Sequence, residues 1–145
     1  MNLEISFIPY GLIGKFLPGV LPFLEESSKR SNGRSSVDDL IRLIITGQYT
    51  LWVVMDEVNN VIYGQFMTEV KEYPSNKMLV IQHVALKPHI MNLIEEKMQT
   101  IAERIAKDFK CAGIEYIGRP GWKKYASKFG YKSESIVYQK FLSTE

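Results

Sequence analysis

The sequence predicts a protein of the α/β (α+β) class, in which helices pack against a central, mostly antiparallel sheet. Two observations predict this class. Apolar runs with strand-like alternation and stretches with helical spacing follow one another in the order β-α-α-β-β-β-α-β-α-β. Short turns separate the three strands in the middle of the chain, so neighbouring strands can pair directly. The 145 residues are enough for one domain, which we expect to span residues 1–145.

The N-terminal stretch predicts a strand and then a helix. Residues 3–9 alternate between apolar and polar side chains, as a half-buried strand does. Pro18 and Pro22 argue against one continuous helix, because proline lacks the N–H that a helix interior needs. We therefore expect a short turn and then a helix that begins near Pro22 and ends before Gly33.

The second helix has clear start and stop signals. Ser36 can accept hydrogen bonds from the free amides of the first turn, and Asp39 stands three residues later. Gly47 is suited to end the helix.

Three strands should follow as an antiparallel meander. They are "TLWVVM", "VIYGQFMTEV" and "KMLVIQHVAL", joined by the turn segments "DEVNN" and "YPSN". Gly64 lies inside the second of them, where a glycine often marks a β-bulge.

The C-terminal half predicts two more helices and two more strands. A long helix should begin at Asn92, whose side chain can cap it while Glu95 reaches back to the cap. A strand at "GIEYI" and a helix at "PGWKKYASKF", ended by Gly130, come next. The last element is a strand at "SIVYQKFL", residues 135–142.

The corner "GIEYIGRPGW" has two interpretations. Pro120 suits the first position of a helix and holds Arg119 extended, while Trp122 and Tyr125 lie on the face that should pack in the core. Packing explains most of this segment. Arg119 is the exception, because a guanidinium beside the free amides of a helix start can contact an anionic ligand.

Composition excludes several classes of protein. With 18 basic and 16 acidic residues, the net charge of +2 does not favour a specific nucleic-acid partner. The N-terminus lacks the pattern of a secretory leader, and no apolar run is long enough for a membrane span, so we expect a cytoplasmic protein. The single cysteine, Cys111, agrees with a reducing compartment. No metal site is expected, because the two histidines and the cysteine do not have metal-ligand spacing.

The order of elements, together with "GRPGWKKYASKFGY", resembles the GNAT superfamily of acyl-CoA N-acyltransferases, and most closely the small GNAT-like proteins of tailed bacteriophages. The segments "GQYTLWVVMDEVNNVIYGQFMTEV" and "MLVIQHVAL" resemble the second to fourth strands of that fold. The resemblance implies a mixed, mostly antiparallel sheet of six to seven strands, flanked by about four helices. For a phage-encoded protein, the cytoplasm would be that of the host.

The resemblance also implies that acetyl-CoA lies between the fourth and fifth strands. Backbone amides near the end of the fourth strand would hold the oxyanion, and the start of the next helix would hold the pyrophosphate. The cofactor contacts implied in this way are Val84, Ala85, Leu86, Lys87, His89, Asn92 and Arg119. One feature departs from the family: "LKPHIMNLIEE" contains no glycine where the family has a glycine-rich segment.

Two residues are candidates for the chemistry. His83 on the fourth strand could act as the base, directly or through a water molecule, because the ordinary pKa of histidine is near 6.5; a structural hydrogen bond is the other interpretation. Tyr125 would match the family's general acid, but it stands five residues before Gly130, whereas the family tyrosine stands four before its glycine.

Two functions therefore remain open. One is an N-acetyltransferase that moves an acetyl group from acetyl-CoA to an amine. The other is a GNAT-fold protein with reduced catalysis that acts by binding a host or phage protein. Self-association as a homodimer is compatible with both, because edge strands can pair. We expect neither a specific nucleic-acid partner nor a membrane partner.

Overall fold

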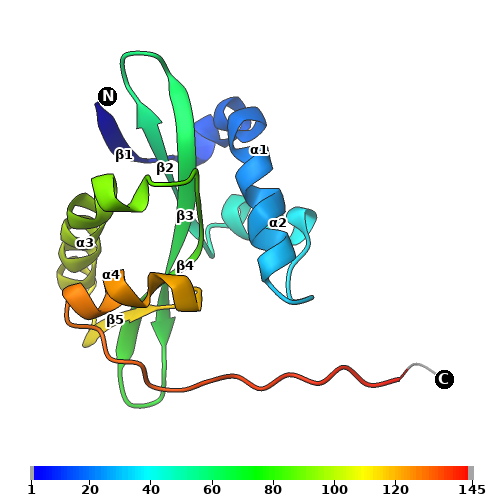
Figure 1. Cartoon of the computed structure of the whole chain (residues 1–145), viewed down its shortest axis with the longest axis vertical. Coiled ribbons are helices and arrows are strands. Elements are labelled where there is room, and N and C mark those ends of the chain that lie inside the picture. The colour runs from blue at the N-terminus through cyan, green and yellow to red at the C-terminus, as the bar shows by residue number, and fades with distance from the viewer. Residues whose placement is uncertain (1, 144–145) are drawn as a thin grey trace.

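The computed structural model describes residues 2–143, and its centre is a five-stranded mixed sheet (Figure 1). The strands lie in chain order, β1-β2-β3-β4-β5. Neighbouring strands from β1 to β4 are antiparallel, and β5 runs parallel to β4. Their bounds are β1 Leu3–Phe7, β2 Thr50–Asp56, β3 Val61–Glu72, β4 Lys77–Leu86 and β5 Gly113–Tyr116.

Helices cover both faces of the sheet. Figure 1 shows α1 and α2 on one side and α3 and α4 on the other. Adjacent residues of β3 point to opposite sides, so Met67 packs in the core under α1 and α2, while Phe66 packs in the core under α3. The helices are α1 Ile13–Arg30, α2 Val37–Ile45, α3 Met91–Asp108 and α4 Lys123–Lys128, with 3₁₀ turns η1 Tyr10–Leu12 and η2 Pro120–Trp122.

The predicted break in the first helix is wrong. α1 is continuous from Ile13 to Arg30 and contains both Pro18 and Pro22. Each proline removes one backbone hydrogen bond, but the helix buries one face against the sheet, including the completely buried Val20 and Leu24. Tertiary packing of this face therefore outweighs the local preference.

The predicted start of the long helix is displaced. α3 begins at Met91, its N-cap is Ile90, and no side chain caps it, so Asn92 lies inside the first turn. Ile90 is buried, which places the start of the helix against the core. Glu95 forms an ion pair with Lys128 of α4 instead of reaching back to a cap.

The predicted final strand is also wrong, and the predicted sheet of six to seven strands has five among the described residues. The segment at 135–142 is extended but pairs with no strand, and it runs away from the body of the molecule (Figure 1). Its sequence has strand character, but strand character alone does not supply a neighbouring edge.

Other local predictions are confirmed. Ser36 and Asp39 form a reciprocal capping box at the start of α2. Gly47 has a left-handed φ of 82° just after that helix. Pro120 opens η2, and Arg119 before it is extended.

The bulge predicted at Gly64 is present next to it. Val54 pairs with Gly64 but Met55 pairs with Ile62, so one extra residue of β3 lies between them. A Cβ at Gly64 would lie 2.6 Å from the carbonyl oxygen of Ala85 and 2.8 Å from Cα of Leu86. Only glycine permits β3 and β4 to approach this closely.

Among residues 2–143, no helix has the length and apolar character needed to cross a bilayer.

Candidate functional site

The strands β4 and β5 diverge, and the candidate site lies where they separate. They pair from Met78 to Ile81 of β4, and β4 continues for five more residues, to Leu86, without pairing with β5. The start of α3 and the η2–α4 segment flank this opening (Figure 1). The two parallel strands thus separate next to the start of a helix, and Val84 of β4 and Tyr116 of β5 pack against the same core cluster there.

A second β-bulge lies at the point of divergence. Gln65 of β3 pairs with Ala85, but Met67 pairs with Gln82, so Phe66 opposes both His83 and Val84. His83 has a left-handed φ of 54°, which is uncommon for a residue with a side chain. The sequence places His83 in a strand, but it carries no signal for this bulge.

Two side chains hold the peptide bond at the bulge in one orientation. Ser27 Oγ of α1 and Gln65 Nε2 of β3 both donate hydrogen bonds to the carbonyl oxygen of His83, at 3.1 and 2.8 Å. A trans peptide bond is planar and its C=O and N–H point in opposite directions. The N–H of Val84 is therefore directed away from Ser27 and Gln65.

The next two residues named as cofactor contacts are part of the sheet. Ala85 and Leu86 are buried and pair with Gln65 and Gly64 of β3. Their side chains belong to the core, so any contact with a ligand would come from their backbone.

The side chain of His83 lies in a polar cluster that includes Tyr49 and Glu69. The rings of Tyr49 and His83 are 5.5 Å apart between centroids. Burial lowers the pKa of His83 below its ordinary value, and the negative charge of Glu69 partly opposes that shift. His83 is therefore neutral near pH 7, as a proton acceptor must be.

Sequence reasoning missed Glu69. It is half-buried on β3, and its carboxylate accepts hydrogen bonds from Gln82 Nε2 at 3.2 Å and Gln48 Nε2 at 3.3 Å. The one signal that could have revealed it is an acidic residue inside the apolar pattern of a strand. Glu69 brings a negative charge close to His83.

A groove with a volume of about 520 Å³ lies between the start of α3 and the η2–α4 segment; we call it the α3–α4 groove. It brings together three of the residues named from the sequence, and its lining is His89, Met91, Asn92, Glu95, Gly121, Trp122, Lys124, Tyr125 and Lys128. Arg119 and Lys87 are not in this lining. The guanidinium of Arg119 lies 4.8 Å from the ring centre of Trp122, and the Lys87 ammonium lies 4.8 Å from that of Tyr63.

The start of α3 meets the chemical needs of a diphosphate. No side chain caps it and its first turn has no acidic residue. Lys124 lines the same groove, and so does Glu95, whose charge is paired with Lys128. His89 adopts a left-handed φ of 66°, so the turn that a glycine would make easily is still made here. Free backbone amides and a positive helix end favour phosphate oxygens. The residues present therefore fit a coenzyme A diphosphate.

Tyr125 faces the interior at the base of the α3–α4 groove. It is buried, and its hydroxyl donates a hydrogen bond to Gln99 Oε1 at 3.1 Å. Burial raises the pKa of Tyr125 well above its ordinary value, so the hydroxyl stays protonated. Such a group can donate a proton, although here it is already engaged with Gln99.

Within residues 2–143, no cluster of three or more His, Cys, Asp or Glu side chains could hold a metal ion. Cys111 is a free, half-buried thiol just before β5. Cys111 follows the C-terminal end of α3, whereas the α3–α4 groove lies at the N-terminal end of that helix.

The fold is shared with known acetyltransferases, although neither a family model nor a curated protein matches the sequence. A GCN5-related N-acetyltransferase from Ralstonia eutropha JMP134 superposes with a TM-score of 0.69 at 14% identity, covering 97% of this chain and 99% of that one. An aminoglycoside acetyltransferase from an uncultured soil metagenomic sample superposes with a TM-score of 0.72 at 13% identity, covering 99% of this chain and 100% of that one.

A third structure, a predicted acetyltransferase with acetyl-CoA from Clostridium acetobutylicum, gives a TM-score of 0.68 at 11% identity, covering 97% of this chain and 96% of that one. At such low identities the likeness concerns the fold and not the activity. The chain has the fold of the GCN5-related (GNAT) N-acetyltransferases.

Proposed function

We propose that the protein is an acyl-CoA-dependent N-acetyltransferase that moves an acetyl group from acetyl-CoA to an amine. The observation that carries this proposal is the separation of β4 from β5 after Ile81, beside the uncapped start of α3. Trp122, which lines the α3–α4 groove, packs against the same core cluster as Val84 of the bulge. The shared fold supports the same assignment.

In this proposal, the cofactor lies along the gap with its diphosphate at the start of α3. Asn92, His89 and Lys124 line that end of the α3–α4 groove. Lys87 and Arg119 lie outside the lining, and we assign them to the more exposed adenosine end. Bound acetyl-CoA supplies an acyl group activated as a thioester.

The residues at the bulge would carry out the rest of the reaction. The N–H of Val84 would donate to the oxyanion that forms on the acetyl carbonyl. His83, kept neutral by burial, would accept the proton that the attacking amine loses. Glu69 would attract the cationic form of the amine to this end of the gap. We assign Tyr125 as the donor to the leaving thiolate.

The origin and setting follow from the sequence resemblance and form part of the proposal. The segment "GRPGWKKYASKFGY" supports a phage-encoded protein, which would work in the cytoplasm of its host. Aminoglycoside acetyltransferases of the same fold act on aminoglycosides, as their names state. A primary amine is accordingly the acceptor class that we propose.

The experiment is a transfer assay that detects free coenzyme A thiol from acetyl-CoA in the presence of a panel of primary amines. We expect turnover by the native chain and a loss of about 100-fold or more in His83→Ala, as is typical when a proton acceptor is removed. Glu69→Gln should raise KM for the amine. Glu72→Gln, at the exposed end of the same strand, is the matched control and should behave as the native chain. Equal turnover by His83→Ala would contradict the assignment.

A second function is favoured by two contacts in the α3–α4 groove. Glu95 forms an ion pair with Lys128 across it, and the Tyr125 hydroxyl is already engaged with Gln99. These contacts support a GNAT-fold protein with reduced catalysis that binds a host or phage protein. Binding of acetyl-CoA together with absence of transfer to every amine in the panel would favour this alternative.

A further inference from the structure

The hydroxyl of Tyr116 on β5 is buried but has no hydrogen-bond partner. Within residues 2–143, the only other buried side-chain atom in this condition is Oε1 of Gln65. Gln65 still donates through its Nε2 to Ser27 and to the carbonyl of His83, whereas the hydroxyl is the only polar group of a tyrosine side chain. A buried donor without an acceptor costs stability, so its presence needs a physical reason.

Tyr116 lies at the point where β4 and β5 separate. It forms the last pair between the two strands, with Ile81. Its ring packs against the same core cluster as Val84 of the β4 bulge. It also lies 6.2 Å from the ring of Trp122 and 5.3 Å from that of Tyr125, and both of these residues line the α3–α4 groove. Tyr116 is therefore packed against both the bulge and the groove.

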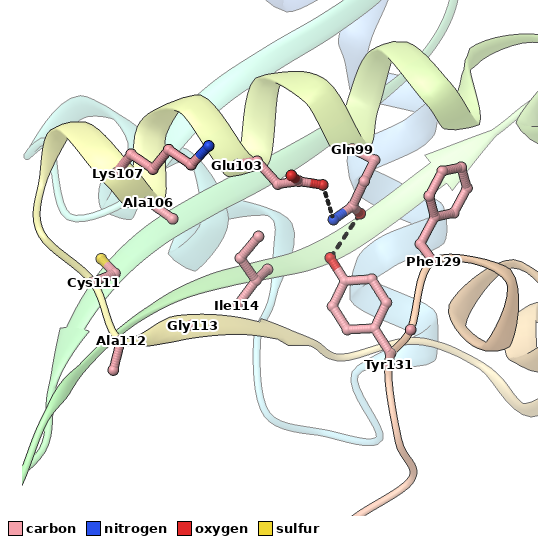
Figure 2. Close-up of a pocket in the computed structure, with 11 residues that line it drawn as sticks. Gln99, Glu103, Ala106, Lys107, Cys111, Ala112, Gly113, Ile114, Phe129 and Tyr131 are labelled. Carbon is pink, nitrogen blue, oxygen red and sulfur yellow. Dashed lines mark hydrogen bonds between the residues drawn. The ribbon is translucent and has the colours of Figure 1, made fainter.

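The neighbouring tyrosine hydroxyls have partners. Those of Tyr125 and Tyr131 both donate to Oε1 of Gln99, at 3.1 and 2.8 Å. Figure 2 shows the bond from Tyr131, and a second bond from Gln99 Nε2 to Glu103 at 3.0 Å. An amide oxygen has two lone pairs, and the two tyrosines use both. Gln99 therefore has no free acceptor for Tyr116, although the rings of Tyr116 and Tyr131 are only 6.1 Å apart.

The missing partner of Tyr116 is a hydrogen-bond acceptor. Burial raises the pKa of Tyr116 well above its ordinary value, so the hydroxyl keeps its proton and can donate it in a hydrogen bond. In the proposed function, the diphosphate lies at the start of α3 and the thioester lies at the bulge. The pantetheine arm joins these two parts of acyl-CoA and carries amide groups. Their carbonyl oxygens are neutral acceptors of the kind that a buried hydroxyl requires.

We propose that the hydroxyl of Tyr116 donates a hydrogen bond to an amide carbonyl of the pantetheine arm of acyl-CoA. The inference rests on the proposed function, because it needs an acyl-CoA where β4 and β5 separate. It makes Tyr116 a cofactor-binding residue whose unpaired hydroxyl lowers the stability of the free protein. Binding of the cofactor then satisfies this hydroxyl. Natural proteins accept such local costs at functional sites.

The first test is thermal unfolding without ligand. Tyr116→Phe keeps the ring and removes only an unpaired hydroxyl, so its Tm should equal or exceed that of the native chain. Tyr131→Phe is the matched control. It removes a hydroxyl that is bonded to Gln99, so its Tm should fall. A Tm that falls in Tyr116→Phe as it does in the control would mean that the hydroxyl already has a partner, and would overturn the proposal.

The second test is calorimetric titration with acetyl-CoA, coenzyme A and ADP. Acetyl-CoA and coenzyme A contain the pantetheine arm, whereas ADP has a diphosphate but no pantetheine. For Tyr116→Phe we expect Kd to rise about 10-fold for acetyl-CoA and for coenzyme A, which corresponds to the loss of one hydrogen bond. The Kd for ADP should stay as in the native chain. Tyr131→Phe should bind all three ligands as the native chain does.

The outcomes separate this inference from the proposed function. Absence of binding of acetyl-CoA and coenzyme A to the native chain would overturn the proposed function and this inference with it. Binding by the native chain that Tyr116→Phe retains at full strength would overturn this inference alone. A weaker Kd for acetyl-CoA but not for coenzyme A would place the hydroxyl at the thioester and overturn it as well. An equal loss with ADP would mean a general change of the groove, with the same consequence.

Discussion

Two buried glutamines organise two different parts of this molecule. Gln65 lies in the middle of the sheet and, together with Ser27, holds the carbonyl of His83 at the β4 bulge. Gln99 lies on α3 and accepts hydrogen bonds from the hydroxyls of Tyr125 and Tyr131. The first acts on backbone within a long strand ladder, whereas the second joins short elements at the edge of the sheet.

The difference shows how the fold separates a rigid part from an incomplete one. The bulge is held by the long pairing of β4 with β3 and by a hydrogen bond from Ser27 of α1, so several neighbours set its geometry. The C-terminal part has a four-residue strand, a six-residue helix and an exposed tail. Side-chain hydrogen bonds from Tyr125 and Tyr131 to Gln99 join these short elements, and no described strand pairs with the outer edge of β5.

The largest expected effect tests the close approach of β3 and β4 at Gly64. Gly64→Ala should lower the free energy of unfolding by about 3 kcal/mol, because its Cβ would overlap backbone atoms of β4, which must shift. Gly121→Ala is the matched control in the C-terminal part, where a Cβ meets nothing within 4 Å. Denaturant unfolding of both variants is the measurement. Equal losses would mean that the two parts are packed alike.

A middle-sized effect compares the two glutamines directly. Gln65→Met and Gln99→Met keep side-chain volume but remove the hydrogen-bonding groups, and each should reduce stability by about 1 to 2 kcal/mol. Gln65→Met frees the peptide bond that orients the Val84 N–H, so we expect it to slow acetyl transfer at saturating acetyl-CoA more than Gln99→Met, which removes only the hydrogen-bond acceptor of Tyr125. Thermal unfolding measures the loss of stability in each variant, and the transfer assay measures the loss of acetyl-transfer rate. Similar losses of activity would contradict the separate roles.

The smallest effect is a pH dependence of stability at His83. Burial lowers its folded-state pKa below the ordinary value of 6.5, so the unfolded chain binds the proton more readily. Stability is therefore fully present above pH 6.5 and falls as the pH drops through the lowered pKa. Unfolding of the native chain and of His83→Gln should be compared between about pH 7.5 and about pH 5.5. His83→Gln should lose less stability over this pH range than the native chain, because it lacks the titrating imidazole. An equal loss of stability in both proteins would contradict the claim that burial lowers the pKa of His83.

Local signals in the sequence predicted much of the fold. The capping box of Ser36 and Asp39 and the corner at Pro120 depend on residues close together in the chain, so reading along the sequence finds them. Elements that depend on distant partners were predicted less well. The continuity of α1 through Pro18 and Pro22 comes from packing on the sheet, which no local pattern records.

The candidate site was predicted in part for the same reason. His83 was recognised as a histidine on a strand, but the bulge around it depends on Ser27 and Gln65, which lie 56 and 18 residues away. Glu69 becomes relevant only when β3 and β4 pair. Residues 135–142 have the composition of a strand, yet they pair with no strand in this structure, because strand composition alone does not supply a neighbouring edge.

The most direct test of the central claim, an acyl-CoA site at the separation of β4 and β5, is thermal unfolding with and without millimolar acetyl-CoA, with coenzyme A and an adenine nucleotide as comparisons. A ligand at about 100 times its Kd stabilises a fold by roughly 2.7 kcal/mol, which raises Tm by several degrees at this size. We predict such a rise with acetyl-CoA and coenzyme A, and little change with the nucleotide. An unchanged Tm with all three would contradict the claim.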